Sequence, residues 1–176
     1  AVALDESNST AHANLAFPYV LIREFDKAVE EGEKGVSLSP NSASGYFALG
    51  FALYFAGRHQ EAIPVLQKCL RLSPVPVHFG VFGWLAASYG VVGQYEEAVV
   101  TLKKMLQIYG PDTFGPHVGL AVNYIFLGRE NEARAEAAEV LRINPKFSVE
   151  QYVKNIPVSP AVKDRWTKAL LKAGLK

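Results

Sequence analysis

Five side chains in this sequence could do nucleophilic or metal chemistry: His12, His59, His78, His117 and Cys69. A metal site needs ligands at spacings such as H-x-x-x-H, and no two of these histidines are so spaced. A nucleophilic thiol needs a nearby base, and Cys69 has no histidine close to it in sequence. We therefore expect no catalytic residue, metal or cofactor. Cys69 should be an inert buried thiol, His59 should lie in a turn and His78 in an insertion between repeats.

Charge and composition exclude further classes of function. The net charge of +1 does not favour a dedicated nucleic-acid binder, and no nucleic-acid partner is expected. No apolar run approaches the roughly 18 residues that a membrane-spanning helix needs. The charged residues between Glu24 and Lys34 alternate in sign, which is typical of the solvent-exposed face of a helix. With one cysteine no internal disulfide can form, and we expect a cytoplasmic, non-enzymatic protein.

The elements that position these side chains follow from an internal repeat. Four segments end alike, as GVSLSP, CLRLSP, MLQIYG and VLRINP, and each carries an alanine at the same earlier offset. These alanines, Ala28, Ala62, Ala98 and Ala133, are separated by 34, 36 and 35 residues. A period close to 34 residues is typical of a solenoid of two-helix units.

The motif resembles the tetratricopeptide repeat. Counted from Ser9, Ala43, Phe79 and Phe114, position 7 is always leucine and position 8 is always small: Ala16, Gly50, Ala86 and Ala121. Position 15 is glycine in three repeats, where it should end the first helix of the pair. The resemblance implies an all-α fold, a right-handed superhelical solenoid of antiparallel helix pairs.

The resemblance also implies a division of the chain. We expect residues 1–8 to end the second helix of a preceding repeat, so that the chain is a piece of a longer protein. Four repeats should follow, over residues 9–42, 43–76, 77–112 and 113–146. Residues 147–176 leave the repeat pattern and should form C-terminal capping helices. Ser159 should cap the last helix, Pro160 should begin it and Gly174 should end it.

A surface for a partner is the main functional prediction. The segment YFALGFALYF, residues 46–55, has no polar face, and a helix that is apolar all round must be covered on every side. In the tetratricopeptide family the first helix of each pair lines a concave groove. The resemblance places there Phe17, Val20, Leu21, Phe47, Phe51, Tyr54, Phe55, Trp84, Val91, Val118, Val122, Ile125 and Phe126.

These residues predict a protein-interaction scaffold that binds an apolar or amphipathic peptide segment in the groove. The lysines, arginines and asparagines with which some family members grip the acidic tail of a chaperone are missing from groove positions 5 and 9. Two other outcomes stay open: the aromatic residues could pack only on each other, or the same face could join two copies into a homo-oligomer.

The end of the chain carries a second resemblance. The stretch FSVE, followed by LLKAGL, is similar to the tail behind tetratricopeptide arrays in bacterial proteins with a class III adenylate/guanylate cyclase or winged-helix regulator domain. This resemblance implies an alternative function, a regulatory or sensory C-terminal module of a bacterial multidomain protein.

Overall fold

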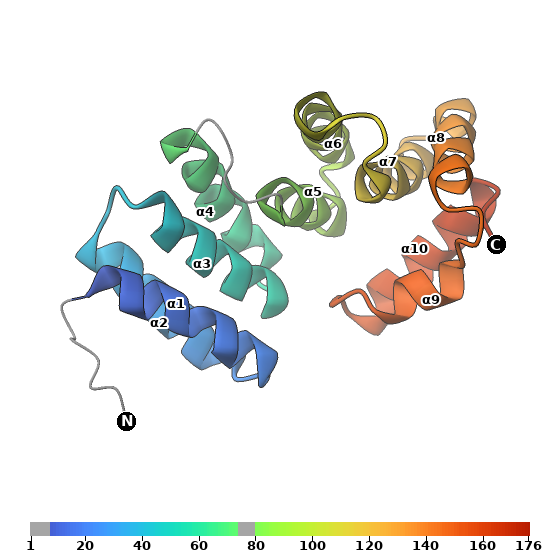
Figure 1. Cartoon of the computed structure of the whole chain (residues 1–176). Coiled ribbons are helices and arrows are strands. Elements are labelled where there is room, and N and C mark those ends of the chain that lie inside the picture. Colours follow the sequence, from blue (N-terminus) through green and yellow to red (C-terminus); the bar gives the residue numbers. More distant parts are fainter. Residues whose placement is uncertain (1–7, 74–79) are drawn as a thin grey trace. The chain divides into compact units, whose positions relative to one another are not determined.

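The computed structural model describes residues 8–73 and 80–176 (Figure 1). Every regular element of the described residues is an α-helix, which confirms the predicted all-α fold. In chain order the helices are α1 (Ser9–Leu21), α2 (Phe25–Leu38), α3 (Ala43–Phe55), α4 (His59–Leu72), α5 (Gly80–Val92), α6 (Tyr95–Tyr109), α7 (Phe114–Phe126), α8 (Glu130–Ile143), α9 (Val149–Lys154) and α10 (Pro160–Lys172).

The chain divides into two compact units, residues 1–88 and residues 89–176, and the boundary between them falls within α5. In unit 1, α1 packs on α2 and α3 packs on α4, while α2 and α1 both contact α3. In unit 2, α7 packs on α6, α8 and α10. We call the first helix of each pair an A helix (α1, α3, α5 and α7) and the second a B helix.

The two helices of a pair are joined by a tight turn in the left-handed backbone region. The predicted turn glycines have φ values of 75° at Gly57, 86° at Gly93 and 73° at Gly128, which confirms their role. In the first repeat Arg23 holds the same place, with φ 63°. Its N–H donates to the Val20 carbonyl as the Gly57 N–H donates to the Tyr54 carbonyl, so the turn is formed in the same way.

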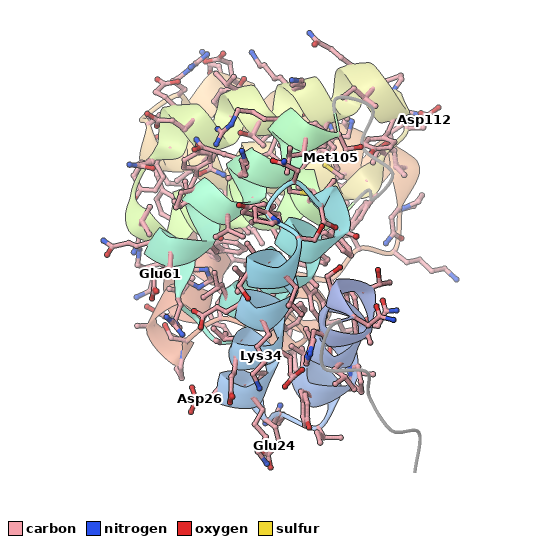
Figure 2. All side chains as sticks on the ribbon, turned by 90° about the vertical axis from the view of Figure 1, so that its left-hand side faces the viewer. Glu24, Asp26, Lys34, Glu61, Met105 and Asp112 are labelled. Atoms are coloured by element: carbon pink, nitrogen blue, oxygen red, sulfur yellow. The ribbon has the colours of Figure 1, made fainter. Side chains whose placement is uncertain are left out.

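Close packing explains the small residues of the repeat. A Cβ built on Gly50 would lie 2.4 Å from Leu66 Cδ2, so a side chain at this position would displace the buried Leu66 side chain of α4. A Cβ on Gly32 would lie 2.8 Å from the Cα of Leu49, a backbone atom of the next repeat. Figure 2 shows Glu24, Asp26 and Lys34 on the outer side of unit 1, and all three are exposed.

The C-terminal helices pack on the last repeat. The rings of Phe147 and Tyr152 lie 5.5 Å and 6.3 Å from the ring of Phe114, centroid to centroid, and this cluster holds α9 against the start of α7. Ser159 accepts a hydrogen bond from the Val162 N–H, Pro160 begins α10, and Gly174 follows its end with φ 103°. These three predictions are confirmed.

Two predictions concern segments that the structure does not describe. The end of a preceding helix, predicted for residues 1–8, lies outside the described residues except for Asn8, whose side chain caps α1. The insertion before the third repeat, which includes His78, also lies outside them.

Candidate binding surface

All four A helices lack charged residues. Each of α1, α3, α5 and α7 has 13 residues, and none of these is lysine, arginine, aspartate or glutamate. The acidic and basic residues of the pairs lie on the B helices and in the turns. Sequence reasoning noticed this only for the second repeat. Aligning the four repeats and comparing their first helices would have shown that the lack of charge is common to all four.

Unit 1 gathers five aromatic residues from its three A helices. Phe17 comes from α1, Phe47, Phe51 and Phe55 come from α3, and Trp84 comes from α5. We call this set the aromatic face. Phe47, Phe51 and Phe55 follow one another at a spacing of four residues and so lie on one side of α3.

The rings of the aromatic face contact each other directly. Phe51 is central: its ring centroid lies 4.9 Å from Phe17, 4.6 Å from Phe55 and 4.9 Å from Trp84. Phe47 joins the set at 5.6 Å from Phe17 and 5.3 Å from Trp84. These spacings are those of attractive aromatic pairs. All five side chains are nevertheless only half-buried, so mutual packing does not cover the face.

The other predicted groove residues of unit 1 divide between surface and core. Leu21, one turn after Phe17 on α1, is 81% exposed and extends the apolar surface beyond the rings. Val20 and Tyr54 are only 6% and 5% exposed, so they belong to the core and cannot line an open groove as predicted. The ring of Tyr54 packs edge-on against His59, at 5.4 Å between centroids.

In unit 2 two of the five predicted groove residues are buried. Val118 and Val122 are 1% and 2% exposed, which contradicts an open groove at these positions, while Val91, Ile125 and Phe126 are half-buried. The helix α10 packs on α7, and its Arg165 places its guanidinium carbon 5.1 Å from the centre of the Phe126 ring. Arg165 Nη2 also donates to the Tyr95 hydroxyl at 2.7 Å. A segment of the chain itself therefore lies on this A helix.

The prediction that His59 lies in a turn is wrong, because His59 is part of a helix and its ring packs against Tyr54 of α3. It is the first residue of α4, it is buried, and its Nδ1 lies 3.4 Å from the hydroxyl of Ser88. Burial lowers the pKa of His59, so the neutral ring is favoured there. The core under the rings is thus uncharged as well.

The two histidines at repeat position 4 each pair with a glutamate that sequence reasoning missed. His12 Nδ1 lies 2.5 Å from the Glu31 carboxylate, and His117 Nδ1 lies 2.6 Å from that of Glu136. Both pairs span 19 residues, and this repeated spacing was the signal that could have revealed them. Burial alone would raise the pKa of Glu31, but the hydrogen bonds from His12 and Lys34 outweigh it and hold that pKa below its usual value. Each histidine–glutamate pair therefore links the A helix of its hairpin to the B helix.

Cys69, the one thiol of the sequence, is not placed to act as a nucleophile. Cys69 is buried, its thiol points at the Ala43 carbonyl at 3.3 Å, and burial raises its pKa to about 11, which keeps it protonated and inert. Within residues 8–73 and 80–176, no three histidine, cysteine or acidic side chains are grouped so that they could hold a metal ion. In the same part of the chain, no helix combines the length and the apolar character required to cross a membrane.

Comparison with known proteins identifies the repeat. The family model of the tetratricopeptide repeat matches residues 43–74, which hold α3 and α4. The chain is similar to the small glutamine-rich tetratricopeptide repeat-containing protein 2 of Saccharomyces cerevisiae, with 34% identity over 70 residues, 40% of this chain and 20% of that protein. It is also similar to the TPR repeat-containing protein YpiA of Bacillus subtilis, with 28% identity over 138 residues, 77% of this chain and 31% of that protein. The chain therefore spans only about a third or less of these relatives.

Solved structures show the same fold. MamA superimposes with a TM-score of 0.72 and 25% identity over 81% of both chains. YrrB, described as a TPR protein with an unusual peptide-binding site, superimposes with a TM-score of 0.70 and 17% identity over 96% of this chain and 86% of its own. Residues 43–74 thus match the tetratricopeptide repeat, and the chain shares the fold of MamA and YrrB.

Proposed function

We propose that this chain is a protein-interaction scaffold whose aromatic face binds an apolar segment of a partner protein. The observation that carries the proposal is the incomplete burial of five contacting rings on helices without charge. Large side chains of this kind are usually buried, and a contiguous exposed apolar patch commonly marks an interaction site.

The energy of such a surface is sufficient for reversible binding. Covering about 400 Å² of apolar surface contributes about 10 kcal/mol before the costs of association. Loss of translational freedom and ordering of side chains remove a large share of this, which leaves an affinity on the order of micromolar.

The charge of the surface favours one class of partner over another. The groove positions of unit 1 carry no lysine or arginine, so an acidic tail would find no counter-charge there. An apolar or amphipathic segment needs none. The peptide-binding site of YrrB is a property of that protein, and it supports the proposal only in that the same fold can bind peptide.

Two substitutions test the proposal. Phe51→Asp puts a carboxylate in the centre of the rings, and Leu21→Lys changes an 81% exposed residue at the edge with little risk to the fold. A partner captured from a cell extract would be identified, produced separately and titrated by calorimetry. We expect each variant to weaken its binding at least about tenfold, because burying a charge against apolar groups is costly.

The matched control for Leu21→Lys is Val100→Lys, which adds the same positive charge at a residue of α6 that is 66% exposed. It should leave binding unchanged, and circular dichroism should show intact helices in all three variants. If both unit 1 variants bind the partner as tightly as the unchanged chain, the aromatic face is not the binding site.

A further inference from the structure

We propose that the partner segment binds the aromatic face as an amphipathic α-helix, not as an extended strand. This inference rests on the proposed function and adds the conformation and side-chain pattern of the partner. It follows from two observations. In unit 1, the aromatic face has almost no side-chain group that could hydrogen-bond to a partner, and in unit 2, the helix α10 packs on the A helix α7.

The first observation is an accounting of hydrogen bonds. Phe17, Leu21, Phe47, Phe51 and Phe55 have no polar side-chain atom, and Trp84 has a single N–H donor. The backbone groups in the interior of the A helices are bonded within each helix, except that Pro18 has no N–H to donate to the Asn14 carbonyl of α1. An extended segment would therefore point every second or third N–H and C=O at rings that cannot pair with them, which is unfavourable. A helical segment satisfies these groups internally and presents only side chains.

The second observation is the position of α10 in unit 2. Val118, Val122 and Phe126 hold repeat positions 5, 9 and 13 on α7, and Phe47, Phe51 and Phe55 hold the same positions on α3. Val118 and Val122 are buried and Phe126 is half-buried, with α10 packed on α7 and Arg165 over Phe126, whereas the three rings of α3 are all half-buried. In unit 2, therefore, a helix of the chain itself packs on an A helix that carries no charge.

The side chains of α10 define the pattern expected of a partner. Its buried stripe consists of Trp166, Ala169 and Leu170, while Asp164 and Lys168 are exposed on its other side and pair with each other. A partner helix should likewise carry large apolar residues at intervals of three and four, with polar residues elsewhere. No particular charge is required, because α1, α3 and α5 offer none to pair with.

Two synthetic peptides with the same composition separate the alternatives. Both consist of leucine and lysine with a single tryptophan and carry a fluorescent label. In the first the apolar residues recur every three or four residues, and in the second they alternate with lysine, which favours an extended strand. Binding of each peptide to the full chain is followed by fluorescence anisotropy, with Phe51→Asp, Leu21→Lys and Val100→Lys as variants.

The helical-pattern peptide should bind at least about tenfold more tightly than the alternating peptide. Its affinity should fall about tenfold in Phe51→Asp and in Leu21→Lys but not in Val100→Lys, and circular dichroism should show that it gains helix on binding. If the alternating peptide binds equally well and depends equally on Phe51, the aromatic face binds peptides but the helical inference is wrong. If neither peptide depends on Phe51 or Leu21, the proposed function fails with it. Concentration-dependent self-association that is lost in Phe51→Asp would instead assign the face to a second copy of the chain.

Discussion

Arg23 occupies a backbone conformation that the other three repeats give to glycine. A side chain in the left-handed region brings its Cβ close to the following carbonyl, at a cost of about 1–2 kcal/mol. Arg23 has φ 63° and an exposed side chain, so the neighbouring hydrogen bonds, and not burial of the arginine, hold it in this conformation.

Arg23→Gly should therefore raise the free energy of unfolding by about 1 kcal/mol. The measurement is urea unfolding followed by circular dichroism. The reverse change in the second repeat, Gly57→Ala, should lower the same free energy, since Gly57 has φ 75°. A loss of stability in Arg23→Gly would mean that the arginine makes contacts that outweigh the strain.

His59 gives unit 1 a dependence on pH. Its pKa is lowered by burial, so on acidification the unfolded chain, with a histidine pKa near 6.5, takes up a proton before the folded chain does. Stability should consequently fall as the pH drops below about 6.5, by at most about 1.4 kcal/mol per pH unit for this residue. Comparing the unfolding free energies of the unchanged chain and His59→Gln from pH 7.5 to 5.5 isolates the effect. Parallel curves for the two proteins would show that His59 takes up its proton equally in both states.

At the scale of the element, the spacing between neighbouring hairpins depends on glycines that admit no side chain. A Cβ at Gly32 would meet the Leu49 backbone at 2.8 Å, and that atom cannot move without shifting α3. A Cβ at Gly83, also inside a helix, would meet nothing within 4 Å. The two positions form a matched pair, with the same residue type in a helix interior and opposite surroundings.

Gly32→Ala should lower the free energy of unfolding by about 1–3 kcal/mol, because the helices must separate. Gly83→Ala should raise it by about 0.5–1 kcal/mol, because alanine restricts the unfolded chain and favours helix. Thermal or urea unfolding of both variants measures the difference. Equal changes in the free energy of unfolding would show that helix propensity alone determines the effect of each substitution and that the close approach of α2 to α3 does not contribute.

At the scale of the whole molecule, each unit has a core of its own. In unit 2 the core reaches the C-terminus: Leu170 is fully buried and Leu175 is 2% exposed, while the Lys172 ammonium pairs with Glu130 of α8. In unit 1 Leu66 of α4 is equally buried. In repeat proteins stability is roughly a sum over units and neighbouring interfaces.

Leu170→Ala should cost about 2–5 kcal/mol, and amide hydrogen exchange should rise most in α7 and α10. Leu66→Ala serves as the counterpart, with its largest effect expected in α3 and α4. If either substitution raised exchange evenly along all the helices, the chain would be one cooperative unit, and this local account of its stability would be wrong.

The sequence by itself determined the repeat and the local structure of each hairpin. The 34- to 36-residue period, the small residue at position 8 and the turn glycines are local requirements of two helices that touch, and each appears in the structure at Gly50 and Gly57. The caps of α10 were predictable for the same reason, since Ser159 and Gly174 act within one turn of the helix ends. Periodicity records such contacts because every repeat must make them.

Only the tertiary structure decided which groove positions are open. Val118 and Val122 read in sequence like Phe47 and Phe51, but they are buried in a unit whose last helix returns to pack on α7. The Tyr54 ring is buried against His59, and His12 hydrogen-bonds to Glu31 of the other helix in its hairpin. These outcomes depend on contacts between residues distant in sequence, and a repeat pattern says which faces are apolar without saying which segment will cover them.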